Sequence, residues 1–583
     1  MVFALLAGPT FAATWNVPAD GDLDDVWGEA SDGDTILIDA ITETHLPSQL
    51  DKRITVVGAG AGSTVLDVSG EGSPALSVTV AVTLRDLTID GDDQVALLEK
   101  HNAETLTLER VELLDGEDLA RSGGALWIDD GAVIATDTSF VGNAAHEGGA
   151  VRVDAGEAFT CDRCTFLDNR SDGAIGDGGA LWLAGSATLT DTVFEANVAP
   201  EWHGGAISVN AAGALTVFGG AFLANVSGGD GGAIVIRANG SATVAPSVSG
   251  PTSFTGQVAL AGGGLSCMGF CDVAITGATF SAGTATNGGH LYNTVGELDV
   301  TDTVLEGGSA SDDGGAVWAM KGTFTRVRMC DNTATDQGGA VWALGDVSLR
   351  NVALLRNTAD VGGGAHLEGD ADLAYATLLG NAATTGAGTW SAGAVEASVW
   401  ADHATLAADG ATTVTDGATW GNTADFGNQV VVVSAAALST DPFLPPAATC
   451  GWPVPQWAGE LWGAGTVGEL DPDGSPSDGG ATGGPDADPS LWADVDGDGV
   501  AAMWDCDDAD PTVGLDCEPP APPDTGAAGD TSPSDTGGSP PDTGGAPPDT
   551  GGSPSDTGSP RPDDGGSAPW AYGEPAAPRT PSA

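Results

Sequence analysis

The stretch Gly123-Gly-Ala-Leu-Trp-Ile128 recurs along the chain as a Gly-Gly-Ala-type triplet followed by an alternating apolar segment. Further triplets begin at Gly148, Gly178, Gly204, Gly231, Gly262, Gly288, Gly314, Gly338, Gly362 and Gly386. The ten intervals between triplets run from 24 to 31 residues. Each unit holds a second alternating segment, of which Thr188-Leu-Thr-Asp-Thr192 is typical. Self-similarity at this period predicts a repetitive solenoid and not several compact domains.

A second signature, Phe-x-x-Asn, follows in the same units. Full copies are Phe140 with Asn143, Phe166 with Asn169, Phe194 with Asn197 and Phe222 with Asn225, while Leu305, Met329, Leu354 and Leu378 hold the apolar position later. Gly and Asn adopt positive φ readily, so each unit carries its own turns. No unit can bury its apolar face alone, and equivalent residues must stack at ~4.8 Å per rung. We therefore expect an all-β fold, a right-handed parallel β-helix or pectate-lyase-like solenoid. A β-propeller fits less well, because its blades need about 40 residues, and helical solenoids fit less well, because they need helix-forming residues.

The two signatures, GGA[ILV] and FxxN, resemble the repeats of the polymorphic outer-membrane proteins. The passenger regions of that family form right-handed β-helices and commonly serve as surface adhesins. Strict copies of the first signature begin at Gly123, Gly148, Gly178, Gly204, Gly231, Gly314 and Gly338, and the resemblance covers about residues 123 to 390. We find no counterpart of that family's C-terminal membrane barrel in this sequence, so we do not expect its autotransport route or outer-membrane insertion to carry over.

The charge balance limits the partners. The 583 residues hold 82 Asp and Glu against 17 Lys and Arg, a formal net charge of −65. This charge repels phosphate backbones and anionic lipid surfaces, so we expect no nucleic-acid partner, whereas a divalent cation fits. The same charge also keeps an exported surface soluble, which is the simpler explanation of it.

The chain begins with an apolar stretch that ends in small residues, Met1 to Ala13, as secretory leaders do, but it lacks their basic first part. We expect cleavage near Ala12 or Ala13 and a mature protein from about Thr14. No later stretch reaches 18 uninterrupted apolar residues, so no transmembrane helix is expected. The predicted location is extracellular or on the cell surface of a bacterium.

The eight cysteines suit an oxidising compartment. Cys161 with Cys164, Cys267 with Cys271, and Cys506 with Cys517 lie close enough in sequence to suggest local bridges, although eight cysteines allow 105 pairings. A zinc site at Cys161 and Cys164 lacks a second ligand pair at the usual spacing.

Alternation after each triplet assigns faces to the residues. Leu126 and Ile128, and their equivalents in later units, are expected to point inward. The residue between them points outward, and this outward column reads Trp127, Arg152, Trp182, Ser208, Val235, Ser266, Tyr292, Trp318, Trp342, His366 and Trp390. We predict that Tyr292, Trp318, Trp342, His366 and Trp390 form a ligand-binding face on which sugar rings or another apolar ligand stack; packing under a loop or a simple preference for strands are the alternatives.

A calcium-type loop follows the repeats. Asp494, Asp496 and Asp498, the carbonyl of Val500, and Asp505 at the twelfth position match the D-x-D-x-D-G-x5-E pattern, except that Asp replaces the terminal Glu. The run on to Pro511 resembles the DxDGDG-DCDD metal-binding motifs of exported bacterial proteins and thrombospondin type-3 repeats. Calcium is the expected cofactor, and an acidic linker is the alternative.

The resulting domain plan has six parts. Residues 1–13 are a leader remnant, 14–122 an N-terminal cap and opening rungs, 123–440 the regular rungs, 441–484 a closing segment, 485–517 the calcium-type loop, and 518–583 a disordered tail. The tail repeats Pro-Pro-Asp-Thr-Gly-Gly units and cannot bury enough apolar surface to fold.

For function, we expect a non-catalytic exported or cell-surface protein, an adhesin or glycan-binding scaffold whose partner is a polysaccharide or a surface protein. One alternative is a polysaccharide lyase or hydrolase of the β-helix class, although the outward column offers only Arg152 and His366 as bases and the acid pair Asp312 and Asp313 precedes a turn. Another is a purely structural spacer. A carboxylate cluster with Arg or Lys beside it on the outward strand face would favour the lyase or hydrolase. Buried tryptophans in the outward column would favour the structural spacer.

Overall fold

The computed structural model describes residues 12–120, 123–173, 176–443, 450–453, 460–461, 464–466, 469–473, 475–493 and 502–503. All of them belong to the first of two units, residues 1–517 and 518–583. The expected calcium ligands Asp494, Asp496, Asp498, Val500 and Asp505, the Cys506 and Cys517 pair and the tail lie outside the described residues. No helix in the described part of the chain has the length and apolar character needed to cross a membrane.

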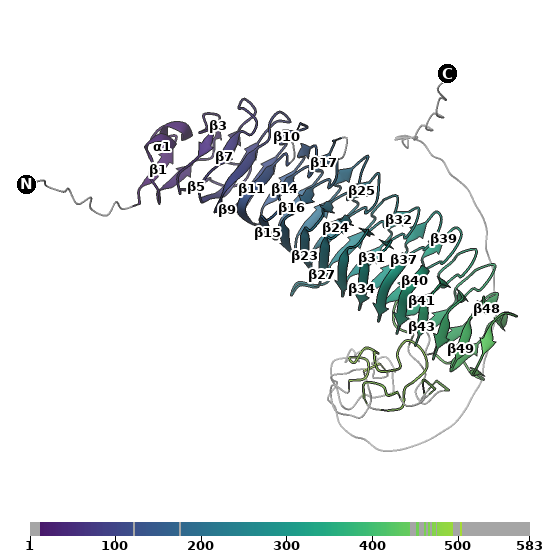
Figure 1. Ribbon diagram of the computed structural model, residues 1–583. Helices are drawn as coiled ribbons and strands as arrows, with labels where there is room; N and C mark the ends of the chain where they lie inside the picture. Colours follow the sequence, from purple (N-terminus) through teal and green to yellow (C-terminus); the bar gives the residue numbers. More distant parts are fainter. Residues whose placement is uncertain are drawn as a thin grey trace, which may run out of the picture. The chain divides into compact units, whose positions relative to one another are not determined.

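The expected all-β parallel solenoid is confirmed. Successive turns of the chain pair through parallel ladders, and the coil makes about 15 turns (Figure 1). Each ladder joins a strand to its equivalent one rung away, as β14 joins β18 through Val151↔Leu181 and Val153↔Leu183. This pairing excludes a propeller, whose blades are antiparallel meanders.

The opening rungs contain the one helix among the described residues. Helix α1 (Leu23–Glu29) starts at Asp22, whose side chain accepts from the backbone N–H of Asp25, and it buries Leu23, Val26 and Trp27 beside β1. It lies at the N-terminal end of the stack (Figure 1). The strands here are β1 (Thr14–Val17), β2 (Thr35–Ile38), β3 (Thr42–Glu43), β4 (Gln49–Leu50), β5 (Thr55–Val57), β6 (Val65–Asp67), β7 (Leu76–Val78), β8 (Val82–Asp90) and β9 (Leu98–Leu114).

Each regular rung has three main strands, and many rungs add a short fourth one. The first strands, which follow the glycine triplets, are the start of β11 (Leu126–Thr136), β14 (Val151–Val153), β18 (Leu181–Leu183), β22 (Ile207–Val209), β26 (Ile234–Arg237), β29 (Leu265–Met268), β33 (Leu291–Asn293), the start of β37 (Val317–Thr325), the start of β40 (Val341–Arg350), β42 (Ala365–Glu368), β45 (Thr389–Ser391) and β48 (Leu406–Asp409). The second strands are the ends of β11, β37 and β40 together with β15 (Ala158–Asp162), β19 (Ser186–Thr190), β23 (Ala214–Phe218), β27 (Ser241–Ala245), β30 (Asp272–Thr276), β34 (Glu297–Thr301), β43 (Asp372–Ala374), β46 (Ala394–Glu396) and β49 (Thr413–Thr415).

The third strands carry the Phe-x-x-Asn signature. They are β12 (Ser139–Val141), β16 (Thr165–Leu167), β20 (Val193–Glu195), β24 (Ala221–Leu223), β28 (Ser253–Thr255), β31 (Thr279–Ser281), β35 (Val304–Glu306), β38 (Arg328–Cys330), β41 (Ala353–Leu355), β44 (Thr377–Leu379), β47 (Val399–Ala401) and β50 (Gly417–Trp420). The short fourth strands are β10 (Glu117–Asp118), β13 (Ala144–Ala145), β17 (Arg170–Ser171), β21 (Val198–Ala199), β25 (Val226–Ser227), β32 (Thr284–Ala285), β36 (Ser309–Ala310) and β39 (Thr333–Ala334). The last rungs end with β51 (Ala424–Phe426), β52 (Val431–Val432) and β53 (Ala435–Ala437).

The core is a set of side-chain stacks along the coil. The inward residues predicted from alternation, such as Leu126 and Ile128, are fully buried. Six phenylalanines of the third strands stack with ring centroids 4.3 to 5.0 Å apart and near-parallel planes: Phe140, Phe166, Phe194, Phe222, Phe254 and Phe280. Parallel, in-register rungs put identical side chains at one rung spacing, which suits ring stacking.

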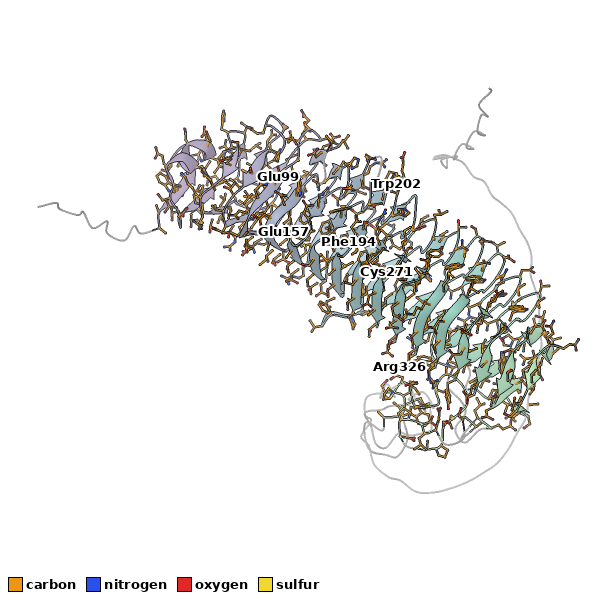
Figure 2. The ribbon with its side chains drawn as sticks, viewed as in Figure 1. Glu99, Glu157, Phe194, Trp202, Cys271 and Arg326 are labelled. Atoms are coloured by element: carbon orange, nitrogen blue, oxygen red, sulfur yellow. A yellow bond between two sulfur atoms is a disulfide. The ribbon has the colours of Figure 1, made fainter. Side chains whose placement is uncertain are left out.

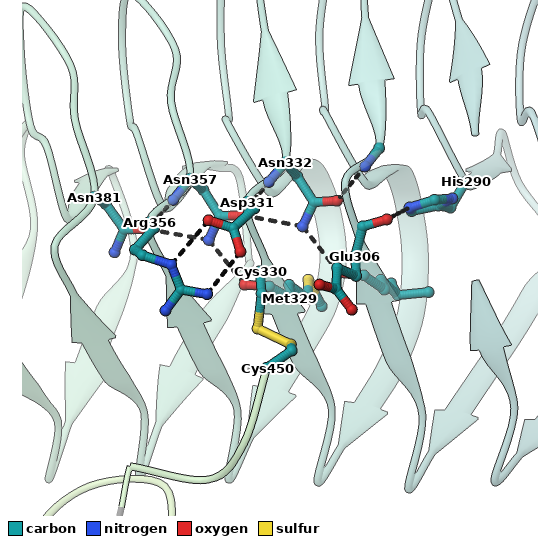
Figure 3. The surroundings of a disulfide bond; sticks show 12 residues. His290, Glu306, Met329, Cys330, Asp331, Asn332, Arg356, Asn357, Asn381 and Cys450 are labelled. Atoms are coloured by element: carbon teal, nitrogen blue, oxygen red, sulfur yellow. Dashed lines mark hydrogen bonds and ion pairs between the residues drawn. A yellow bond between two sulfur atoms is a disulfide. The ribbon is translucent and has the colours of Figure 1, made fainter. Parts of the chain in front are cut away.

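The Asn of the second signature forms a buried ladder. Asn143 Nδ2 donates to Leu113 O and to Asn169 Oδ1, both at 3.0 Å, and the same pattern runs through Asn197 and Asn225. Gln257 then takes the Asn position. A second ladder joins Asn332, Asn357 and Asn381 (Figure 3).

His290 fills the break between the two ladders. The ladder position is glycine at Gly283 and Gly308, and a Cβ there would lie 2.6 and 2.8 Å from the His290 ring. His290 replaces the alanine of its triplet, is buried, and contacts Glu306 O through Nε2 at 3.1 Å (Figure 3). The two glycines therefore admit an imidazole where the other rungs hold an asparagine.

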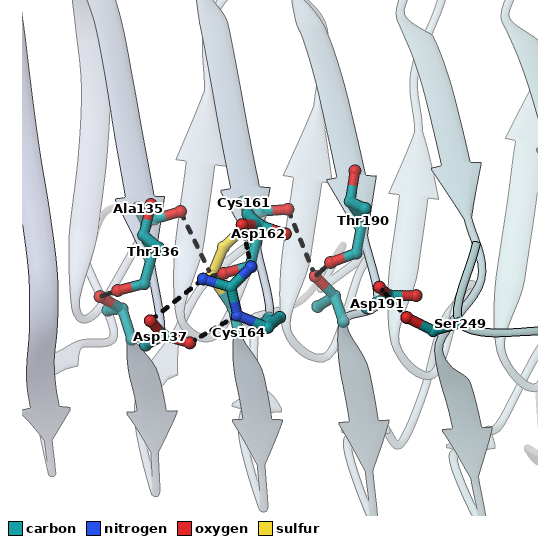
Figure 4. Close-up of polar contacts among 12 residues, drawn as sticks. Ala135, Thr136, Asp137, Cys161, Asp162, Cys164, Thr190, Asp191 and Ser249 are labelled. Carbon is teal, nitrogen blue, oxygen red and sulfur yellow. Dashed lines mark hydrogen bonds and ion pairs between the residues drawn. A yellow bond between two sulfur atoms is a disulfide. The ribbon is translucent and has the colours of Figure 1, made fainter. Parts of the chain in front are cut away.

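Turns between the second and third strands use the left-handed conformation at residues other than glycine. Asp137 and Arg163 have φ of 49° and 53° and face each other across one rung. Arg163 Nε donates to Asp137 Oδ1 at 2.8 Å, and the pairs Arg110 with Asp86 and Arg326 with Asp302 repeat this contact. Dashed lines in Figure 4 mark the contacts made by Asp137. Each of these pairs places a basic side chain beside an acid.

Two of the suggested disulfides are confirmed and one unexpected bridge is found. Cys161 bonds to Cys164 and Cys267 to Cys271, which rules out zinc coordination by the first pair. Cys330 bonds to Cys450, 120 residues later (Figure 3). Short spacing could not indicate this bridge, because it depends on where the closing segment folds back.

The closing segment packs along the side of the stack. Cys450 and Ala481 lie in one apolar cluster with Cys330, Ala353 and Leu355 on the outer face of the third strands. The Ala481 N–H donates to Thr377 Oγ1 at 2.9 Å, and Arg350 Nε donates to Asp486 Oδ2 at 2.9 Å. The segment therefore covers a side wall of the later rungs.

Candidate binding face on the first strands

The predicted outward column has the expected register. Trp127 pairs with Arg152, Arg152 with Trp182, and each later member with the next, through Ser208, Val235, Ser266, Tyr292, Trp318, Trp342, His366 and Trp390. The column continues backward to Glu99. In Figure 2, Glu99 and Trp202 lie along one edge of the coil and Arg326 along the opposite edge.

The aromatic members of the column stack on one another. Ring centroids are 4.6 Å apart for Tyr292 and Trp318, 4.7 Å for Trp318 and Trp342, and 4.3 Å for His366 and Trp390. Tyr292 and the three tryptophans are half-buried. A platform of ring faces was expected, whereas the rings cover one another's faces and turn their edges outward, because the rung spacing is close to the distance of ring stacking.

His366 is more buried than its neighbours. It is 4% exposed, its Nε2 contacts Glu368 Oε1 at 3.0 Å, and burial lowers its pKa. Its neutral imidazole thus acts as one flat member of the stack.

The column is interrupted by three small residues, Ser208, Val235 and Ser266, which are fully buried. Trp182 precedes them and Tyr292 follows them. We call this run of three small residues, between Trp182 and Tyr292, the notch. Arg152 lies over the Trp182 ring at 4.4 Å and Trp318 stacks on Tyr292, so the covered ring faces point away from the notch.

Charged side chains gather around the notch. We call Asp177, His203, Asp230 and Arg237 the charged cluster. Arg237 forms an ion pair with Asp177, and the backbone N–H of His203 donates to Asp177 Oδ1 at 3.2 Å. The backbone N–H of Asp230 donates to His203 Nδ1 at 2.8 Å. A neutral His203 therefore carries its proton on Nε2.

Burial shifts the pKa values of this cluster. It raises the pKa of Asp230, against the opposing charges of His203 and Arg237, and lowers the pKa of His203. Burial, and then the Asp230 charge, raise the pKa of Tyr292. Asp230 thus lies close enough to influence both His203 and Tyr292, and both His203 and Tyr292 favour the neutral form.

Unpartnered polar atoms concentrate on this face. Among the described residues, nine buried side-chain N or O atoms have no hydrogen-bond partner, and five belong to the column or to its neighbour Arg237. They are Trp182 Nε1, Ser208 Oγ, Arg237 Nε, Ser266 Oγ and His366 Nδ1. Four of these five adjoin the notch. Buried polar atoms are nearly always satisfied, so this concentration needs an explanation.

A second group of acids lies beside the later column. Carboxylate oxygens of Asp312, Asp313 and Asp336 come within 4.8 Å of one another. Burial, and then the charges of Asp312 and Asp336, raise the pKa of Asp313 to about 6. Oxygen ligands of this kind suit a hard divalent cation.

The charged cluster was missed from the sequence. Its acids stand immediately before glycine triplets, at Asp177 and Asp230, where turns favour Asp in any case. The available signal was the run of three small residues in a column of large ones. The expected binding residues Tyr292, Trp318, Trp342, His366 and Trp390 do share one line, but the structure adds the notch at its N-terminal end.

Comparison with known proteins is limited to the fold. No protein-family model matches the chain, and no curated protein matches it. Two solved structures are similar to it: the A-module of Azotobacter vinelandii mannuronan C-5 epimerase AlgE6, at 12% identity over 74% of this chain and 100% of that chain with a TM-score of 0.28, and the AlgE4 A-module, at 14% identity over 72% and 100% with a TM-score of 0.21. Scores this low carry no argument about activity.

Proposed function

We propose that this protein is an exported, non-catalytic β-solenoid that binds an extended polysaccharide along its outward column. The observation that carries the proposal is the in-register line of aromatic side chains from Tyr292 to Trp390, in which Tyr292 and the three tryptophans are half-buried and His366 is buried. Trp and Tyr combine an apolar body with a polar tip, which suits ligands that have both apolar C–H faces and hydroxyls. A line of sites one rung apart suits a linear polymer better than a compact ligand.

The biological setting is part of the same proposal. The leader-like start and the resemblance of the repeats to surface adhesins support a cell-surface or secreted scaffold. In this proposal calcium binds to Asp494, Asp496, Asp498, Val500 and Asp505. It stabilises the segment that follows the solenoid in the sequence. Calcium binding by the full chain, weakened by an Asp496→Asn and Asp498→Asn double variant in a titration, would support this assignment; equal binding by both proteins would contradict it.

The test of polysaccharide binding compares the full chain with a Trp318→Ala, Trp342→Ala, Trp390→Ala variant on a glycan array. We expect the wild type to bind and the variant to lose binding. Phe218→Ala is the matched control, because Phe218 is a 38%-exposed aromatic on the second strands, away from the column. No binding by the folded wild type, or equal loss in the control, contradicts the proposal.

A polysaccharide lyase or hydrolase is the second candidate, and the charged cluster favours it. Asp230 with a raised pKa has the property of a general acid, and an Arg stands beside two carboxylates on the outward face. Incubation with the bound polysaccharide distinguishes the two functions. New reducing or unsaturated ends that disappear in Asp230→Asn would favour the enzyme, and an unchanged polymer would favour binding.

A further inference from the structure

We propose that the last rung of the coil is a dimer contact, in which strand β52 of one copy pairs antiparallel with β52 of a second copy about a two-fold axis at Val432. This rung consists of β51, β52 and β53. The contact is independent of polysaccharide binding, because its readout is the mass of the particle.

The outer edge of the last rung is open. In the described part of the chain β51 pairs only with β48, β52 only with β49 and β53 only with β50. Strands β48 and β49 lie at the end of the stack opposite to helix α1 (Figure 1). Val431, Val432 and Val433 are 59%, 43% and 64% exposed, whereas Val414, the partner of Val432 one rung earlier, is fully buried. The apolar core is therefore open to solvent at β52.

The backbone of β52 is self-complementary. The N–H groups of Val431 and Val433 donate to Thr412 O and Val414 O of the preceding rung, both at 2.8 Å. Backbone groups alternate in direction along a strand, so the N–H and C=O of Val432 point away from the coil. Two residues that lie directly opposite in an antiparallel pair can exchange both N–H···O bonds. A two-fold axis at Val432 makes this residue its own partner and satisfies both groups in both copies.

The side chains of β52 suit the same pairing. Val432 points inward as Val414 does, so the two copies of Val432 join the apolar cores across the contact. Val431 and Val433 point outward, and the two-fold axis places Val431 of each copy beside Val433 of the other. Residues 426–440 contain no charged residue and no proline, which are two devices that protect open strand edges from pairing.

A second copy is the occupant that these features favour. The chain carries a formal charge of −65, and an uncharged edge lets two copies meet without direct repulsion at the contact. Helix α1, which buries Leu23, Val26 and Trp27, occupies the other end of the stack, so coils do not join head to tail through it (Figure 1). A contact of this symmetry closes after two copies. It uses one rung of each copy and buries less than about 1,200 Å², so the dimer should be reversible.

Sedimentation velocity of the full-length protein over a range of concentrations tests the contact. We expect the monomer mass at low concentration and twice that mass at high concentration, and added salt should favour the dimer by screening the net charge. Val431→Glu with Val433→Glu places like charges opposite each other twice and should weaken the dimer by about tenfold. Val432→Pro removes the outward N–H, keeps both bonds to the preceding rung, and should also weaken the dimer.

Val248→Glu with Val295→Glu is the matched control. It adds the same charge at two valines that are 107% and 43% exposed on other rungs, and it should leave the dimer unchanged. Val431→Glu with Val433→Lys places opposite charges across the two-fold axis and should restore the dimer, which separates a lost contact from a failure to fold.

Three results would overturn the proposal. A wild type that is monomeric at every concentration leaves the edge to another segment of the chain or to a different protein. A dimer that survives both Val432→Pro and the double Glu variant, or that is lost equally in the control, does not form through β52. A dimer that the combination of Glu and Lys fails to restore does not have its two-fold axis at Val432.

Discussion

Asn357 Oδ1 accepts two hydrogen bonds from Asn332, one from its backbone N–H and one from its Nδ2, both at 3.0 Å. Both residues are fully buried. The side chain of each ladder Asn thus satisfies polar groups of the neighbouring rung, which explains why an amide recurs three positions after the apolar residue.

Asn357→Ala should therefore be strongly destabilising. It leaves the backbone N–H of Asn332 without an acceptor and removes one of the two acceptors of Asn332 Nδ2, which keeps Leu305 O. An unsatisfied buried group costs about 1 to 3 kcal/mol. We expect a clear drop in the urea midpoint measured by circular dichroism. Asn428→Ala is the control, because Asn428 is exposed and should change the midpoint little. Similar midpoints for the two variants would contradict a structural role of the ladder.

His290 should make stability fall in mild acid. Burial lowers its pKa to about 4, while an unfolded histidine titrates near 6.5. The unfolded state therefore binds the proton first, and the stability contribution present above pH 6.5 is lost as pH falls toward 4. The loss at pH 5 is about 2 kcal/mol.

His290→Gln should flatten this dependence when unfolding is compared at pH 7 and pH 5. His403 has a similarly lowered pKa of about 4 and remains in the variant, so part of the slope should persist. An identical slope for wild type and variant would show that His290 is protonated with little effect on folding.

Asp471 should act in the opposite direction. Burial, and then the charge of Asp478, raise its pKa to about 7. The folded state holds this proton while the unfolded chain has lost it, so stability declines as pH rises from about 4 to 7. Asp471→Asn keeps Oδ1, which accepts from the N–H groups of both Asp478 and Gly484, and removes the charge. We expect a higher melting temperature than wild type at pH 8 and a smaller difference at pH 4; a lower one at pH 8 would contradict the assigned pKa.

The Cys330 to Cys450 bridge should hold the closing segment in place. A bridge across 120 residues contributes about 5 kcal/mol in the chain-entropy treatment, against about 2 kcal/mol for the short Cys161 to Cys164 loop. Cys330→Ser with Cys450→Ser should speed proteolysis within residues 450–493 and leave the regular rungs protected. Cys161→Ser with Cys164→Ser is the control. Equal proteolysis of the two double variants would contradict a role of the Cys330 to Cys450 bridge in holding the closing segment.

Much of the architecture could be predicted because every rung of a parallel coil forms from the same local pattern of turn residues and alternating strand residues. The inward position of Leu126 and the pairing of Trp318 with Trp342 follow from alternation and from a period near one rung, with no long-range information. The outward column was therefore correct in register over its whole length. Ring orientation was not predictable, since it depends on how neighbouring side chains share the space between rungs.

The sequence by itself determined the coil, the faces of its strands and the positions of its turns, because glycine, asparagine and alternating apolar residues act within a single rung. Only the tertiary structure decided the contacts that join non-equivalent positions of different rungs. Arg237 reaches Asp177 two rungs away, His290 enters the space left by Gly283 and Gly308, and Cys450 returns to Cys330. These contacts depend on side-chain direction and on the path of irregular loops, which vary from rung to rung and leave no periodic signal.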